Sequence, residues 1–170
     1  VSENGHLQMP LPFKERPSLP NNQKLAEIRF QHLIRKFNRN PELKEEYISF
    51  MKELLKNGYA EPVTSIAAMG SVNFIPHHGV YHPRKRKLRV VFDCSAKYAG
   101  LSLNQYLLKG PDVTNSMVGV LCRFRKQSCD IEKMFFQFKV DERDRSYLQF
   151  LWFKDCDPSK EVVPFRMTVH

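Results

Sequence analysis

Two short segments contain residue types that could do chemistry. In the stretch Cys129–Phe135, the carboxylate of Asp130 is followed five residues later by the aromatic ring of Phe135. A carboxylate at such a place can bind a divalent ion, and an aromatic ring at the next turn can form a floor for a sugar. The spacing also occurs by chance, and the plainer interpretation is that Asp130 caps a turn while Phe135 belongs to the core.

The second segment is Lys87–Asp93, in which Arg89 lies within a run typical of a β-strand. A basic stretch, Arg84, Lys85, Arg86 and Lys87, precedes it. The planar guanidinium group of an arginine can hold a triphosphate through paired hydrogen bonds. The alternative is an exposed edge strand, where Lys and Arg oppose aggregation.

Two helices are predicted to come first in the chain. Residues 1–20 contain four prolines, which remove backbone donors, so we expect an extended arm without regular elements. Apolar residues recur at helical spacing from Asn22 to Asn38. A second helix is predicted after Asn40, which can cap it, with Pro41 in the first turn and Gly58 at its end.

Short β-runs dominate the rest of the chain. Val72–Ile75 and Lys87–Asp93 predict a hairpin with the basic stretch at its tip. A helix is predicted over residues 117–126, and a turn at Asp157–Ser159. The fold class is α+β with a mostly antiparallel sheet, and the remaining strands are expected at Phe135–Val140, Tyr147–Phe153 and Val162–Val169.

The composition favours a folded basic protein. Apolar residues make up 42% of the 170 residues, and 27 Lys and Arg against 18 acidic residues give a formal charge of +9. Such an excess suits a partner that carries phosphates. The apolar stretches are too short to cross a bilayer, so we expect no membrane partner.

The histidines and cysteines do not indicate a metal site. His77, His78 and His82 lack a matching carboxylate or cysteine pair, which predicts ordinary surface histidines. The four cysteines have no zinc-site spacing and are expected to be reduced thiols, which favours an intracellular, cytoplasmic location.

Five blocks of the chain resemble one known family. They are "MPLPFKERPSLPNN", "NPELKEEYISFMKELLKNGYAEPV", "KLRVVFDCSAK", "LSLNQYLLKGPD" and "DIEKMFFQFKV", in this order over nearly the whole chain. Together they are similar to the reverse transcriptase of BEL/Pao-type LTR retrotransposons. The resemblance implies a right-hand polymerase, with a helical pair at 21–58, a fingers-like β region at 59–112 and a partial palm at 113–170 after the arm.

The resemblance also implies roles for single residues. Asp130 corresponds to the aspartate that binds both catalytic Mg²⁺ ions, and Ile131 to the residue that offers a backbone carbonyl to a metal. Phe135 corresponds to the steric gate against a ribose 2′-hydroxyl. Arg89 and Asp93 match the fingers arginine that contacts the incoming deoxynucleotide and the aspartate four residues later.

The chain departs from the family pattern at two points. It contains no adjacent pair of aspartates, whereas the family completes its metal site with a Tyr-x-Asp-Asp turn. The strand before Asp130 is shortened, because Arg123–Cys129 leads directly into it. Two ions about 4 Å apart need several carboxylates, so we expect a C-terminally truncated fragment that binds Mg²⁺ weakly and is inactive alone.

Three hypotheses remain open from the sequence. The chain is a catalytic-domain fragment, a non-catalytic basic module that binds primer–template, or a part whose site another polypeptide completes. An aspartic protease is excluded because the chain has no Asp-Thr-Gly or Asp-Ser-Gly triplet. A ribonuclease H is excluded because the chain lacks the set of carboxylates that this enzyme needs.

Overall fold

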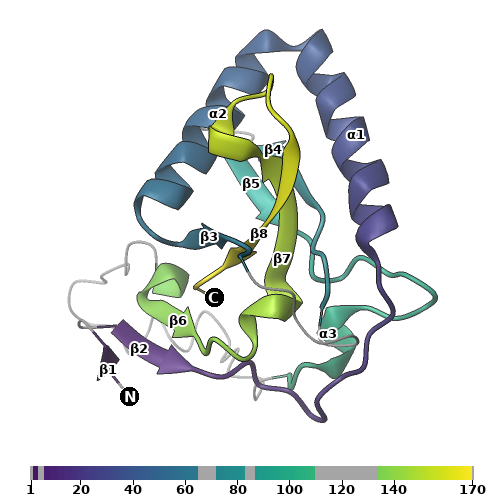
Figure 1. Ribbon diagram of the computed structural model, residues 1–170, viewed down its shortest axis with the longest axis vertical. Coiled ribbons are helices and arrows are strands. Elements are labelled where there is room, and N and C mark those ends of the chain that lie inside the picture. The colour runs from purple at the N-terminus through teal and green to yellow at the C-terminus, as the bar shows by residue number, and fades with distance from the viewer. Residues whose placement is uncertain (1, 4–5, 65–71, 83–86, 110–133, 170) are drawn as a thin grey trace, which may run out of the picture.

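The computed structural model describes residues 2–3, 6–64, 72–82, 87–109 and 134–169. Over these residues the chain is a mixed α/β fold, in which two long helices and a short one accompany three small sheets (Figure 1). The expectation of helices combined with mostly antiparallel strands is therefore confirmed. The predicted helix at 117–126 lies outside the described residues.

Both predicted N-terminal helices are present. Helix α1 spans Gln23–Arg39 and buries Ala26, Phe30, Leu33 and Phe37. Helix α2 spans Pro41–Lys56, and its cap is as predicted, because the Asn40 side chain accepts a hydrogen bond from the Leu43 backbone N–H. Gly58 ends this region in the left-handed conformation, with φ of +69°.

The main sheet has the order β3–β8–β7 and is antiparallel, with β3 at Ala60–Pro62, β7 at Gln149–Phe153 and β8 at Val162–Met167. All five residues of β7 are buried. Trp152 in β7 is fully buried and stacks on Tyr47 of α2, while Phe30 and Phe37 of α1 meet it edge-on. Aromatic packing thus joins the helical pair to the sheet.

The ends of this sheet match the predictions in part. The strand expected from Tyr147 begins at Gln149, because Arg145–Leu148 forms a 3₁₀ helix, η2. A short 3₁₀ segment, η3 (Lys154–Cys156), follows β7. The predicted turn at Asp157 is confirmed, since its carboxylate accepts hydrogen bonds from the backbone N–H and hydroxyl of Ser159.

The second sheet is a hairpin of β4 (His77–Tyr81) and β5 (Leu88–Phe92). The prediction of β5 is confirmed, but the prediction of its partner strand at Val72–Ile75 is wrong. Phe74 instead forms a parallel bridge with Gln149 of β7. Its backbone is held there by the buried side chain of Asn22, which accepts from the Phe74 N–H and donates to the Phe74 carbonyl.

The third sheet joins the N-terminal arm to a strand late in the chain and has the order β1–β2–β6, with β1 at Ser2–Glu3, β2 at His6–Met9 and β6 at Phe138–Val140. The prediction of no regular element in residues 1–20 is wrong here, because the prolines begin at Pro10 and leave the preceding backbone donors free to pair. The strand predicted from Phe135 is also wrong at its start. Met134–Gln137 is a 3₁₀ helix, η1, and β6 pairs in parallel with β2.

The remaining helix, α3, spans Leu103–Tyr106. Ser102 and Gln105 cap it reciprocally. None of the helices in the described part of the chain is long and apolar enough to cross a membrane.

Candidate nucleotide and nucleic-acid site

The β4–β5 hairpin presents one face to the core and one to solvent. Leu88, Val90 and Phe92 point inward and pack against the core, whereas Arg89 and Val91 are exposed. Lys87, at the start of the strand, is exposed too. Alternation along a strand therefore places the two cations on the outer face.

Arg89 is unpaired within the described part of the chain. The register sets it opposite Val80, and neither strand brings an acidic side chain to it. Asp93 lies four residues further along, about 13 Å away at the rise of a strand. The structure therefore does not join Arg89 and Asp93 in an ion pair.

Asp93 has a local role instead. Its backbone N–H donates to the Pro76 carbonyl at 2.7 Å, and its carboxylate accepts from the backbone and hydroxyl of Ser95. These bonds close an Asx-type turn at the end of β5. Burial, and then the neighbouring Asp93 carboxylate, raise the pKa of the adjacent Cys94 thiol to about 11.

The other predicted site residues lie outside the described residues or at their margin. Asp130, Ile131, Arg84, Lys85 and Arg86 are not described. For Phe135 the structure places the backbone in η1. The roles predicted for these residues therefore stay predictions.

The N-terminal arm, residues 6–20, binds the chain on both sides of the segment 110–133, in which Asp130 lies. Before that segment, the Leu108 N–H donates to the Pro12 carbonyl at 2.7 Å. After it, β6 pairs with β2, and the Asp141 N–H donates to the Met9 carbonyl at 2.9 Å. The arm thus contacts described residues that precede and that follow this segment in the chain. Figure 1 shows β2 of the arm beside β6.

A buried carboxylate, Asp144, anchors the same arm. It is 1% exposed and accepts one hydrogen bond from the Leu11 backbone N–H, at 2.9 Å, and one from the Arg16 guanidinium. The Tyr147 hydroxyl donates to the Pro17 carbonyl nearby. Sequence reasoning missed Asp144, because nothing in the local sequence distinguishes it from an exposed turn residue.

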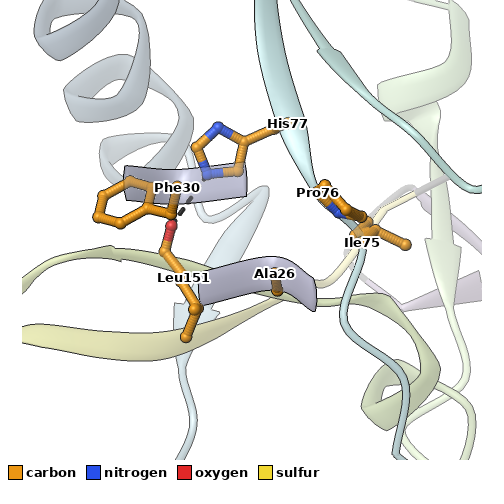
Figure 2. A pocket seen from close by; sticks show the side chains of 6 residues that line it. All are labelled: Ala26, Phe30, Ile75, Pro76, His77 and Leu151. Atoms are coloured by element: carbon orange, nitrogen blue, oxygen red, sulfur yellow. Dashed lines mark hydrogen bonds between the residues drawn. The ribbon is translucent and has the colours of Figure 1, made fainter. Parts of the chain in front are cut away.

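His77 corrects a second prediction. It is not a surface histidine but a buried one that connects β4 to α2 and β7. Figure 2 shows its ring beside the Leu151 carbonyl of β7. Its Nε2 lies 2.9 Å from the Leu151 carbonyl, which can only accept, so Nε2 carries the proton. Its Nδ1 then accepts from the Tyr47 hydroxyl at 2.6 Å. Burial lowers the pKa of His77 to about 4, so the ring is neutral, and burial raises the pKa of Tyr47.

The cavity beside His77 is too small for a substrate. It is lined by His77 and otherwise by apolar side chains, and it measures about 10 Å³, which is room for at most one water molecule (Figure 2). Both ring nitrogens of His77 already have partners. The residue therefore fixes β4 against α2 and β7 and takes no part in a pocket for chemistry.

Among the described residues, no group of three or more His, Cys, Asp or Glu side chains could hold a metal ion. The two described cysteines, Cys94 and Cys156, are free thiols. No protein-family model matches the chain, and no curated protein matches it significantly.

Proposed function

We propose that the chain is the fingers and first palm segment of a reverse-transcriptase-type polymerase of the BEL/Pao kind. Its partners would be a primer–template duplex and a deoxynucleotide. The observation that carries the proposal is Arg89, which is exposed on the outer face of the β4–β5 hairpin and has no ion-pair partner among the residues that the structure describes. The resemblance assigns to this residue a contact with the triphosphate, and an exposed guanidinium without a competing carboxylate nearby supports that assignment.

The way in which the hairpin is held supports this role. A guanidinium group can bind a triphosphate in a fixed geometry only if its strand is rigid. His77 bonds to α2 and to β7 from the strand opposite β5, and Phe92 of β5 packs on Phe150 of β7. In the proposal, the hairpin belongs to the fingers and the helical pair packs against it, and β6 to β8 form part of a palm.

The donor set that the resemblance assigns to this chain does not fit a pair of Mg²⁺ ions. The resemblance assigns one carboxylate, Asp130, and the 170 residues contain no adjacent pair of aspartates. Two ions at close distance need several carboxylates to balance their charge. We therefore derive no catalytic step and propose that this chain alone does not synthesise DNA.

Primer extension tests the catalytic part of the proposal. The purified chain is incubated with primer–template, deoxynucleotides and Mg²⁺ or Mn²⁺, and no extension is expected. Extension that persists through purification and is lost in Asp130→Ala would show that the site is complete.

A titration with a fluorescent deoxynucleoside triphosphate, in the presence of primer–template, tests Arg89. Arg89→Gln should weaken binding about tenfold, and Arg89→Lys should restore only part of it, because an ammonium group lacks the planar fork. His78→Gln is a matched control, since His78 is exposed on the neighbouring strand. Equal affinities for the wild type and Arg89→Gln would refute the contact.

A second candidate is a basic module that binds nucleic acid without chemistry. The exposed Lys87 beside Arg89, together with the net charge of +9, favours it. Binding to duplex should be independent of sequence and should fall steeply with salt. Substitution of Arg84, Lys85 and Arg86 by Gln should weaken this binding. An affinity that does not change between low and moderate salt would eliminate this candidate.

A further inference from the structure

Helix α1 carries a one-sided set of cations on its solvent-facing surface. Lys24, Arg29, Arg35, Lys36 and Arg39 are all exposed, and the helix contains a single acidic residue, Glu27. Five cations less one acid give +4, which is nearly half of the net charge of the chain. In this respect α1 differs from α2, in which three lysines are accompanied by four glutamates.

The cations share one side of the helix. At 3.6 residues per turn, they fall within an arc of about 140°, opposite the stripe that packs on the core. From Lys24 to Arg39 the arc runs about 22 Å along the axis at 1.5 Å per residue. We call this surface the α1 basic face; in Figure 1 it belongs to the helix at the outer edge of the molecule.

Stabilisation of the helix does not account for this face. Lys36 and Arg39 lie in the last turn, where cations interact favourably with the helix dipole, but Lys24 lies in the first turn, where a cation is unfavourable. None of the five cations forms an ion pair with another described residue. Their charges are therefore available to an outside partner.

We infer that the α1 basic face binds the phosphate backbone of a nucleic-acid duplex. Its length corresponds to about six base-pair steps along the axis of a duplex, at 3.4 Å per step. The face presents no exposed Phe, Tyr or Trp ring, because Phe30 and Phe37 are buried, and the exposed ring within its arc is the imidazole of His32. It therefore offers little of the stacking surface that single strands require.

A membrane surface is the less suitable partner. A helix that binds lipid inserts an apolar face, whereas the apolar face of α1 is packed against β7, β4 and α2. The α1 basic face also lies on a different element from the hairpin of the proposed function. The inference therefore stands even if the polymerase proposal fails.

The test compares two variants that lose the same charge. Lys24→Gln/Arg29→Gln/Arg35→Gln removes three cations from the α1 basic face. Lys52→Gln/Lys56→Gln/Lys97→Gln is the control, because these lysines are exposed elsewhere and form no ion pair among the described residues.

Binding of a labelled 20-base-pair duplex is followed by fluorescence anisotropy between 50 and 200 mM salt. The α1 variant should bind at least about tenfold more weakly than the wild type. The slope of its plot of log K against log salt should be smaller in magnitude by about two to three. The control should stay within about twofold of the wild type. Urea unfolding establishes that both variants are folded.

Four results would overturn the inference. An equal loss in both variants would mean that only total charge matters, and an α1 variant that binds like the wild type would exclude the face. A single strand of equal length is the third comparison. If the wild type binds it as tightly as the duplex, and the α1 variant loses as much affinity for it, the face does not select a duplex. Binding to phosphatidylserine vesicles that is lost in the α1 variant, without a loss for duplex, would point to a membrane.

Discussion

Acidification should destabilise the fold through His77 in a pH window that the structure defines. The pKa of this histidine is about 4 when folded and 6.5 when exposed, because burial disfavours the charged ring. Between pH 6.5 and pH 4, the ring is protonated in the unfolded chain but stays neutral in the folded chain. The free energy of unfolding should therefore be unaffected above pH 7 and should decrease as the pH falls from 6.5 towards 4.

The size of the loss follows from the difference in pKa. Each pKa unit corresponds to about 1.4 kcal/mol, so the loss at or below pH 4 approaches about 3 kcal/mol, and at pH 5 it is about 2 kcal/mol. That is a large fraction of the stability of a typical domain. Since Asp141 is held ionised by Arg143, with a pKa of about 2, its effect falls in a lower window.

Urea unfolding at a series of pH values measures this loss. Trp152 is the one tryptophan in the chain and is fully buried, so its fluorescence reports unfolding. His77→Gln keeps a neutral donor and acceptor and should remove most of the decrease between pH 7 and 5, whatever its effect on stability at neutral pH. The matched control is His78→Gln, which should keep the decrease because His78 is exposed.

Parallel curves for the wild type and His77→Gln between pH 7 and 5 would refute the reasoning. The titration of the ring can also be followed by NMR in the unchanged protein. A pKa near 6.5 for His77 would mean that the folded chain does not bury it as a neutral group.

Three further substitutions test the anchoring of the arm, the backbone and the buried hydrogen bond. Asp144→Asn should cost about 2 kcal/mol in urea unfolding, because it removes the buried charge that pairs with Arg16; no loss would mean that the arm is not anchored there. Ala99→Gly should stabilise by about 0.5–1 kcal/mol, since Ala99 has a φ of +49°, and Gly100→Ala at φ of +81° is the opposing control. Tyr47→Phe should cost about 1–3 kcal/mol by leaving a buried ring nitrogen without its donor, and a neutral result would exclude that hydrogen bond.

The sequence could predict the candidate site only where the alternation of inward and outward side chains along a strand determines which residues are exposed. The exposure of Arg89 follows from the apolar residues on either side of it in β5. The separation of Arg89 from Asp93 follows from the same geometry. The enclosure of His77 could not be predicted, because its partners Tyr47 and Leu151 lie 30 and 74 residues away.

The sequence by itself determined the features that depend on neighbouring residues. The cap at Asn40, the left-handed Gly58 and the buried stripes of α1 and α2 follow from interactions within about four residues, which local composition encodes. The Asp157 turn is of the same kind.

Only the tertiary structure decided which strands pair. The sequence predicted Val72–Ile75 as the partner of β5, yet the hairpin uses His77–Tyr81, because Asn22 and β7 hold Phe74 elsewhere. The parallel pairing of β2 with β6 joins residues more than 120 apart. Such pairings depend on the free energy of the whole packed arrangement, which cannot be deduced from the pattern of residues within one strand.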